Sequence, residues 1–486
     1  MMRSGIFCLW PLLAAVITVT NARPPMGNVE RATPGKLVVA HHIIGFTDPY
    51  AVSDWQSDIQ LAYDSGLDGF ALNVGSESWE PTQVANAYQA AKNLGLDFKL
   101  FVSLDMSSFP CTTADDASIL RDYVTNYASH PNQLLWNGKV FISTFSGSDC
   151  TFGQSSAAAG WQSEFINQLT GSNAVHFVPS FFVDPSTFTT FNGVMNGDFN
   201  WNGGWPIDLT YASAQSELGS NAGDLDDATF PSSVEGTLTG NIGVFATDSQ
   251  YINGLNSVSG SDKTYIAAVT PWFFTHYSPQ TYNKNWIYLA DYWSYNTRWE
   301  TLIEKRDQVD VVEIVTWNDY SESHYIGPIE GSQPNSQAWT NGMPHLGWLA
   351  MTNYYATAFR EGSYPAITKD QIYMWARPHP KNADSSDSVG KPTSYQLTED
   401  KLWAVVFAQS NAIVVISTAS GTTQTVDVSA GVTKLSMDLV PGSGMSATMT
   451  RNGQTVVSLE PGSAFTFNAS PEIYNYNAFV AYATSG

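Results

Sequence analysis

Apolar runs alternate with amphipathic segments over most of the first two thirds of the chain. KLVVAHHIIGF (36–46) is typical of a buried strand, and AVSDWQSDIQLAYDSG (51–66) places Trp55, Ile59 and Ala62 on one helical face before Gly66. The same strand-then-helix pattern returns in the segments that begin near residues 67, 96 and 139. Continuous apolar strands separated by helices predict a parallel sheet that is covered on both faces.

Further apolar runs extend this pattern to eight units. They lie at 174–183, 193–206, 264–274 and 309–319, and a helix is expected at 291–308. Eight units favour a closed (β/α)8 barrel of the TIM type over an open, doubly wound sheet. No GxGxxG follows the first strand, which argues against dinucleotide binding. The predicted fold class is therefore α/β, with a barrel over residues 36–364.

The pattern changes after residue 369, and the first 22 residues differ from both parts. From about residue 370, short runs rich in Val, Ile and Thr are separated by turn residues, which predicts an antiparallel β-sandwich over 369–486. Residues 1–22 combine Arg3, an apolar run from Ile6 to Val19 and small residues near Ala22, a pattern typical of a secretory signal peptide. We therefore expect a secreted protein.

Charge and composition narrow the classes of partner. The formal charge of −23 comes from 21 basic and 44 acidic side chains, and it would repel nucleic acid and anionic lipid. No later segment approaches about 20 uninterrupted apolar residues, so no membrane span is expected. Aromatic residues make up 13% of the chain, which suits a neutral, polyhydroxylated ligand, although core packing explains many rings equally well. We expect a monomer that binds neither nucleic acid nor membrane.

Two modifications are expected in an exported chain. Cys111 and Cys150 remain as a pair once Cys8 leaves with the signal peptide, and an oxidising compartment favours a disulfide between them. Two free buried thiols are the alternative. Asn468 begins an Asn-Ala-Ser glycosylation sequon, which the following Pro471 weakens.

In a β/α barrel the active site lies at the carboxyl ends of the strands. We therefore expect substrate-binding side chains at those ends: His42, Asn73, Asp198, Trp201, Trp272, Trp317, Asn318, His324 and Tyr325. His41 and His42 are adjacent, so at most one of them faces the barrel interior. Asp105 is expected to bind a substrate hydroxyl or to anchor its loop. No HExxH, zinc-type Cys/His spacing or GxSxG elbow is present, and no metal or cofactor is expected.

The stretch VTWNDYSESHYIGP (315–328) carries two carboxylates at the end of the eighth strand, Asp319 and Glu322. Hydrolysis of a glycosidic bond needs one carboxylic acid to protonate the departing oxygen and one carboxylate to activate water or attack the sugar. Aromatic neighbours would raise the pKa of one carboxyl group by excluding water. The alternative is a capped surface turn without catalytic function.

AHHIIGF, SDWQSDIQLAYDSGLDGFALNVG, KLFVSLDM and VTWNDYSESHYIGP resemble glycoside hydrolase family 71, the fungal endo-1,3-α-glucanases or mutanases, from about residue 36 to 364. The resemblance implies a secreted barrel followed by a β-sandwich, acting on α-1,3-glucan of fungal walls or dental plaque with inversion. It implies that Asp319 and Glu322 are the catalytic pair and that Asp68 supports activity, although Asp68 begins its strand and so lies far from the barrel mouth. Ser321 stands where the family pattern has Gly.

We therefore expect Glu322 to act as the acid and Asp319 as the base, about 6.5 to 9.5 Å apart as inversion requires. A retaining glycosidase, or one acting on another glucan, is the main alternative among enzymes. Outside enzymes, the chain would be a wall-binding protein that retains polysaccharide without cleaving it.

Overall fold

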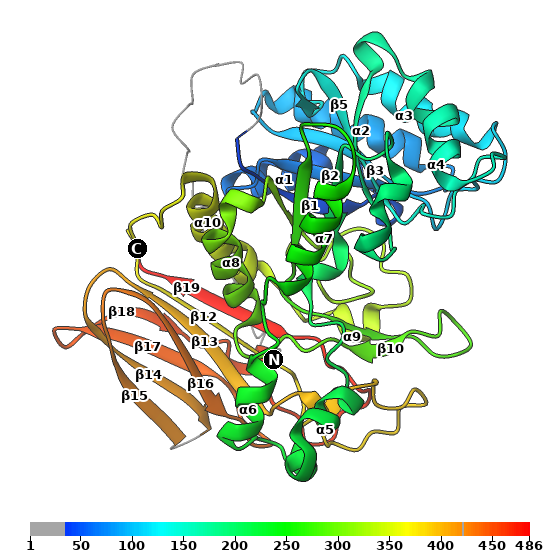
Figure 1. The fold of residues 1–486 in the computed structure, drawn as a ribbon. Coiled ribbons are helices and arrows are strands. Elements are labelled where there is room, and N and C mark those ends of the chain that lie inside the picture. Colours follow the sequence, from blue (N-terminus) through cyan, green and yellow to red (C-terminus); the bar gives the residue numbers. More distant parts are fainter. Residues whose placement is uncertain (1–34, 420–421) are drawn as a thin grey trace, which may run out of the picture.

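The computed structural model describes residues 35–419 and 422–486 (Figure 1). The predicted signal peptide, residues 1–22, lies outside the described residues. Among the helices of the described part, none is long and apolar enough to cross a membrane. One large, mainly parallel sheet is followed by smaller antiparallel sheets, which confirms a mixed α/β class.

Eight parallel strands form the large sheet in the hydrogen-bonded order β6-β5-β3-β2-β1-β11-β8-β7. A short strand, β4 (Leu135–Trp136), pairs antiparallel with β5. The parallel strands are β1 (Leu37–Ile43), β2 (Gly69–Val74), β3 (Lys99–Asp105), β5 (Lys139–Phe145), β6 (Val175–Ser180), β7 (Gly197–Asn200), β8 (Thr264–Val269) and β11 (Val311–Ile314). Neighbours in the sheet are therefore successive parallel strands of the chain, except that the last, β11, pairs with the first, β1, as expected when eight strand-helix units curl round.

The sheet curls until its two end strands approach each other at Asn196. The backbone N of Asn196 donates to Phe177 O at 2.8 Å, and Phe177 N donates to Asn196 Oδ1 at 3.1 Å. No regular ladder joins β6 to β7. One asparagine therefore links the two ends of what we call the curled sheet.

Successive side chains of each strand point to opposite faces of the curled sheet. Val39, Ile266 and Val311 belong to the apolar cluster on the inner face. Val38 and Val312 belong to the larger cluster between the sheet and its helices. Because the side chains on both faces of each strand are buried, the strand sequences are continuous apolar runs and show no alternation of apolar and polar residues.

Helices pack against the outer face and fill the connections. The first helix buries Trp55, Ile59 and Ala62, as its periodicity predicts, and Gly66 follows with a left-handed φ of +87°. The helices are α1 (Val52–Asp64), α2 (Glu80–Leu94), α3 (Asp116–Tyr127), α4 (Ala157–Gly160), α5 (Tyr211–Leu218), α6 (Ser232–Thr239), α7 (Ala246–Ser257), α8 (Ser294–Glu304), α9 (Gln337–Thr340) and α10 (Leu346–Glu361).

Two connections differ from the sequence prediction. The helix expected after the fourth parallel strand is only the short α4, which continues as a π-helical turn over Trp161–Phe165. The connection between β7 and β8, for which no helix was predicted, contains α5, α6 and α7. Small and polar residues dominate these three helices, so their apolar stripes are too short for periodicity to reveal them.

Beyond α10 the chain forms two antiparallel sheets of four strands each. Their orders are β16-β13-β12-β19 and β15-β14-β17-β18. Ile372 and Val406 of the first sheet and Val414 and Met449 of the second share one apolar cluster. The strands are β12 (Gln371–Ala376), β13 (Lys401–Ala408), β14 (Ala412–Ala419), β15 (Thr422–Val428), β16 (Gly431–Asp438), β17 (Ser446–Arg451), β18 (Gln454–Leu459) and β19 (Phe479–Thr484).

The first antiparallel sheet also packs against the helices of the N-terminal part (Figure 1). Trp375 on β12 and Trp348 on α10 lie in one cluster, with ring centroids 5.8 Å apart. Trp293 Nε1 donates to Ala404 O at 2.9 Å, and Arg377 forms a buried ion pair with Asp291 at 2.7 Å. The two parts of the chain therefore share one continuous core.

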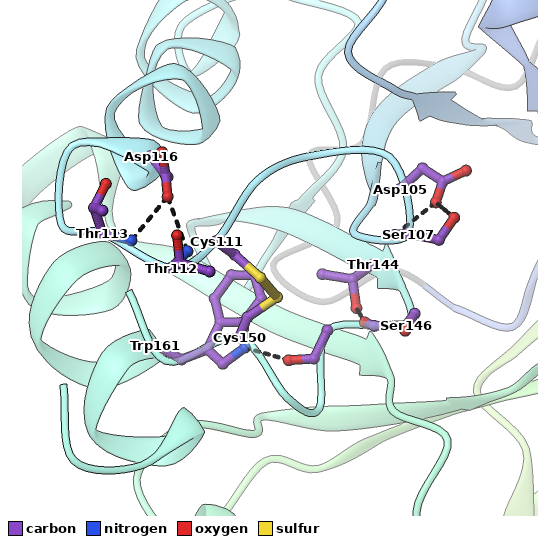
Figure 2. The surroundings of a disulfide bond; sticks show 11 residues. Asp105, Ser107, Cys111, Thr112, Thr113, Asp116, Thr144, Ser146, Cys150 and Trp161 are labelled. Atoms are coloured by element: carbon purple, nitrogen blue, oxygen red, sulfur yellow. Dashed lines mark hydrogen bonds between the residues drawn. A yellow bond between two sulfur atoms is a disulfide. The ribbon is translucent and has the colours of Figure 1, made fainter. Parts of the chain in front are cut away.

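Cys111 and Cys150 form the predicted disulfide, with 5.0 Å between their Cα atoms (Figure 2). The bond joins the loop after β3 to the loop after β5, and both loops leave the carboxyl ends of their strands. Beside it, Trp161 Nε1 donates to Gly147 O at 2.9 Å, which holds the second loop against the π-helical turn. Two of the loops at this edge of the curled sheet are thus fixed to each other.

Candidate active site

The segment after β11 is anchored to β1 by its backbone and by one amide side chain. Trp317 N donates to His41 O at 2.7 Å. Asn318 Oδ1 accepts from Ile43 N at 2.7 Å, and Asn318 Nδ2 donates to Ile43 O at 3.0 Å. The Asn318 side chain thus continues the pairing of β1 with β11 past the end of the ladder. This anchor fixes the position at which Asp319 leaves the sheet.

Asp319 and Glu322 lie in one tight turn at the carboxyl edge of the curled sheet. Asp319 Oδ1 accepts from Ser321 Oγ at 2.5 Å and from Glu322 N at 3.1 Å, and Asp319 N donates to Thr316 Oγ1 at 2.8 Å. The Asp319 and Glu322 side chains are 14% and 17% exposed. Both carboxylates are therefore held by the turn and still reach solvent.

Two basic side chains contact this carboxylate pair. His324 Nε2 lies 3.1 Å from Glu322 Oε2 and 3.8 Å from Asp319 Oδ2. Lys284 Nζ donates to the other Glu322 oxygen, Oε1, at 3.0 Å. Lys284 comes from the turn of the antiparallel hairpin β9 (Phe274–His276) and β10 (Asn285–Ile287), which follows β8 in the chain. Glu322 is thus engaged by a partner at each of its oxygens.

The environments shift the pKa values of the two carboxyl groups in opposite directions. Burial raises the pKa of Asp319, and the charge of Glu322 adds to this rise, while His324 opposes it. Burial also acts to raise the pKa of Glu322, but the hydrogen bonds and charges of His324 and Lys284 outweigh it and lower that pKa to about 2. One carboxyl group therefore keeps its proton more readily than the other, as acid-base catalysis requires.

One oxygen of Asp319 and one oxygen of Glu322 lie close to each other. Asp319, Glu322 and His324 each bring one potential ligand atom within 4.8 Å of the others, and the structure has no second cluster of this kind among residues 35–419 and 422–486. This distance between single oxygen atoms is shorter than the separation of about 6.5 to 9.5 Å between carboxyl groups that is expected for inversion. Since Lys284 already places an ammonium group against Glu322, we assign no metal to this cluster.

Three further predicted residues lie at the carboxyl ends of strands in the curled sheet. Asp105 ends β3 and accepts from Ser107 Oγ at 2.5 Å, and its charge contributes to raising the pKa of Lys284 (Figure 2). Trp201 follows β7, with its ring centroid 6.4 Å from that of His324. Asn73 lies at the carboxyl end of β2, beside Ser103 of β3, and is 6% exposed. Their contact with substrate remains a prediction.

His42 and Asp198 were assigned to the wrong face of the sheet. His42 hydrogen-bonds Asp58 of α1 at 3.2 Å, and it is the adjacent His41 that faces inward and contacts Trp201. Asp198 alternates with the inward-facing Phe199 and is completely buried on the outer side, where burial raises its pKa. Both errors concern which residues of a strand face the inside of the curled sheet. Two consecutive polar or aromatic residues do not determine this.

Trp272, Trp317 and Tyr325 are at most 1% exposed, which makes them poor platforms for a polymer. Trp272 Nε1 donates to the backbone O of Tyr476, and Tyr325 OH donates to Met343 O at 2.5 Å. Asn318, also 1% exposed, serves as the anchor described above. These side chains stabilise the loops around the pair instead of facing a ligand.

The last two predicted residues lie away from the pair. Asp68 precedes β2, where its carboxylate accepts from Val38 N at 2.9 Å and from Arg360 Nη1 at 3.1 Å. Asp68 therefore stabilises the amino-terminal ends of the strands, opposite the acid pair, as its position in the sequence suggested. Asn468 is exposed and available for glycosylation, which remains a prediction.

Sequence reasoning missed two features. Lys284 lies in a hairpin without a recognisable motif, so nothing in the sequence links it to Glu322. Glu313 interrupts the apolar strand VDVVEIV, and its Oε1 lies 2.6 Å from His41 Nδ1 inside the curled sheet. The sequence could have indicated this contact, because a single carboxylate in a buried strand needs a hydrogen-bonding or charged partner.

The chain is similar to three fungal proteins over nearly its whole length. A glucan endo-1,3-alpha-glucosidase of Schizosaccharomyces pombe is 36% identical over 472 residues, 96% of each chain. An ascus wall endo-1,3-alpha-glucanase of the same yeast is 33% identical, over 93% of this chain and 98% of its own. A mutanase of Penicillium rubens is 28% identical over 492 residues, 100% of this chain and 97% of the mutanase.

The sequence model of glycosyl hydrolase family 71 matches residues 34–486, which include the acid pair, the hairpin that carries Lys284 and both antiparallel sheets. A match of this length covers every residue that the structure describes. The chain belongs to glycosyl hydrolase family 71.

Proposed function

We propose that the protein is a secreted endo-acting hydrolase that cleaves α-1,3-glucan. The observation that carries the proposal is the pair Asp319 and Glu322, which share one anchored turn and have pKa values shifted in opposite directions. The substrate is taken from the relatives, whose names describe action on 1,3-α-glucan.

In this proposal Asp319 is the acid and Glu322 the ionised carboxylate, the reverse of the roles expected from the sequence. Asp319 donates its proton to the glycosidic oxygen as the bond from that oxygen to the anomeric carbon breaks. Glu322 accepts a proton from the water whose oxygen bonds to that carbon. The reversal follows from Lys284 and His324, which stabilise the charged form of Glu322.

We propose inversion from the family resemblance. The short distance between oxygens of Asp319 and Glu322 instead favours the alternative, a retaining mechanism. In retaining enzymes the two carboxyl groups stand about 5 to 5.5 Å apart and one attacks the sugar directly. Proton NMR of the first product distinguishes the two courses. A β-configured sugar released from the α-linked glucan means inversion, and an α-configured sugar means retention.

The proposed architecture is a (β/α)8 catalytic barrel over 36–364 and a β-sandwich over 369–486, in a monomer exported after loss of residues 1–22. The link between β6 and β7 at Asn196 supports barrel closure, and the apolar cluster shared by the two antiparallel sheets supports the sandwich. Export is supported by the apolar start of the chain and by the ascus wall location in the name of one relative.

The function is tested with Asp319→Asn and Glu322→Gln beside Glu304→Gln, a control at a carboxylate that is 73% exposed. Release of reducing sugar from purified α-1,3-glucan is expected to fall by orders of magnitude in the first two variants and to stay unchanged in the control. β-1,3-Glucan and starch should remain intact with all proteins. Binding of α-1,3-glucan by the wild type without release would instead identify a non-catalytic wall-binding protein.

A further inference from the structure

A cavity of about 450 Å³ lies between the β9–β10 hairpin and the segment 388–393 of the C-terminal part. Its volume falls within the range of about 300 to 1,000 Å³ that is usual for small-ligand sites. The side chains that matter for its chemistry are Tyr277, Asn283, Asn285 and Trp286 from the hairpin region, and Ser388 and Thr393 from the segment.

The two walls of the cavity are fixed to each other. Asn285 Nδ2 donates to Gly390 O at 2.8 Å, and Thr393 N donates to Asn285 O at 3.0 Å. Below them, His276 Nε2 lies 2.8 Å from Asp387 Oδ2 in a nearly buried pair. In Figure 1 the hairpin beside β10 projects from the molecule close to the loops of the C-terminal part. The cavity is therefore a preformed site to which both parts of the chain contribute.

The chemistry of the lining suits a neutral sugar. Amide and hydroxyl groups of Asn283, Ser388 and Thr393 can exchange hydrogen bonds with sugar hydroxyls, and none of the lining residues is charged. Tyr282, beside the cavity, is 56% exposed, the largest exposure among the large apolar side chains of the described residues. Its ring meets that of Tyr277 edge-on, with centroids 4.7 Å apart. An exposed ring beside hydrogen-bonding groups is the combination that stacks against and orients a sugar.

The same hairpin borders the acid pair. Lys284, between Asn283 and Asn285, donates to Glu322, and the charge of Asp319 acts on Tyr277 in the cavity wall. A polymer bound across the carboxyl edge would therefore pass from the acid pair to the cavity along one hairpin.

We propose that this cavity is a glucan subsite, distinct from the cleavage position, that binds glucosyl units of the polymer beyond those that flank the bond that is cut. The inference rests on the proposed function for the identity of the glucan. It gives the C-terminal part of the chain a direct role in substrate binding, since Ser388, Gly390 and Thr393 belong to that part.

Two independent changes test the subsite. Gly390→Trp should fill the cavity, because a Cβ at Gly390 meets no atom within 4 Å and its φ is not positive, while Gly236→Trp, at an exposed glycine of α6 that meets the same two conditions, is the matched control. Tyr282→Ala removes the exposed ring, with Tyr482→Ala, at a 45% exposed tyrosine on β19, as control. Thermal unfolding of every variant shows whether it is folded, and if Gly390→Trp is not, Tyr282→Ala decides the question.

The measurement is kcat/KM on α-1,3-linked glucose oligosaccharides of increasing length, together with retention on insoluble α-1,3-glucan. Gly390→Trp and Tyr282→Ala are expected to lose roughly tenfold in kcat/KM on long substrates, which corresponds to about 1.4 kcal/mol. They should match the wild type on the shortest substrate that is cleaved, and both controls should match it at every length.

The outcomes separate this inference from the proposed function. Length dependence and retention identical to the wild type in both variants would overturn the subsite, even if the wild type cleaves α-1,3-glucan well. If the wild type does not cleave α-1,3-glucan, the proposed function fails. The same variants are then compared on whichever glucan the wild type cleaves or retains, and unchanged behaviour there overturns the subsite as well.

Discussion

Lys284 is the side chain through which a surface loop acts on both members of the acid pair. Its ammonium donates to Glu322 Oε1 at 3.0 Å, and its charge lowers the pKa of both Glu322 and Asp319. Because Lys284 is 46% exposed, solvent and salt weaken this influence. It is a positioning residue, since it acts on the chemistry through Glu322.

Replacing Lys284 with Met is expected to move the pH profile of kcat/KM to higher pH on both sides. The acid limb reflects protonation of Glu322 and the basic limb reflects loss of the proton from Asp319. A nearby positive charge stabilises both carboxylates, so removing it raises both pKa values. Lys284→Arg should restore the profile, and salt should shift the wild type towards the Met variant. A uniform loss of rate with unmoved limbs would show that Lys284 only supports the hairpin.

Contacts between residues could be predicted where both residues lie in one short segment, and they were missed where distant parts of the chain meet. Asp319 and Glu322 share one short turn after a recognisable strand, so their proximity follows from the local sequence. Lys284 reaches Glu322 from 38 positions earlier in the chain, a contact that no spacing rule encodes. His42 was chosen over His41 because the phase of a buried strand cannot be read when both faces are apolar.

At the scale of elements, the junction of β1 with the segment after β11 determines where the acid pair stands. Asn318 makes both hydrogen bonds that a backbone neighbour of Ile43 would otherwise make. The ladder of β1 with β11 ends at Ala40 and Ile314, so this side chain carries the alignment three residues further along β1. The Asn318 side chain thus replaces backbone pairing with β1 at the point where the chain turns away from the sheet.

Asn318→Ala is expected to destabilise the protein by about 1 to 3 kcal/mol and to lower kcat more than it raises KM. The amide and carbonyl of Ile43 would lose their partner in a nearly buried site, which is costly. Urea unfolding and steady-state kinetics measure the two effects. Asn93→Ala, at an exposed position on α2, should change neither quantity. If stability falls and kcat is unchanged, Asn318 stabilises the fold but does not position Asp319 and Glu322 for catalysis.

Most strands and the long helices could be predicted from the sequence, because each is a local pattern of apolar residues. The strand order around the curled sheet also followed, since successive parallel units place neighbours side by side. The helices between β7 and β8 escaped prediction because their buried faces are short, as in α5, where only Ala214 is buried. The hairpin over the acid pair escaped too, because β9 and β10 have three residues each and no turn motif marks them.

The whole molecule is held together by a core that crosses from one part of the chain to the other. Alternate residues of β12 divide between two clusters, with Met374 facing the second antiparallel sheet and Trp375 facing α10. The first antiparallel sheet is therefore buried on both faces, and one of those faces belongs to the N-terminal part. Removal of residues 369–486 would expose Trp348 and the apolar side of α10 to water.

Trp375→Ala is expected to lower the free energy of unfolding of the entire chain by about 3 to 5 kcal/mol, the usual cost of deleting a buried Trp. Trp375 is 1% exposed, whereas Trp79→Ala, at 37% exposed, should have little effect. Because the core is continuous, loss of glucan hydrolysis and loss of tryptophan fluorescence should follow one denaturant transition, shifted equally in Trp375→Ala. If the two parts were independent, Trp375→Ala would unfold the C-terminal sheets first and leave the activity transition where it stands in the wild type. The denaturant concentration at which activity is lost therefore decides between two alternatives. Either the antiparallel sheets stabilise the part of the chain that carries the acid pair, or the two parts unfold independently.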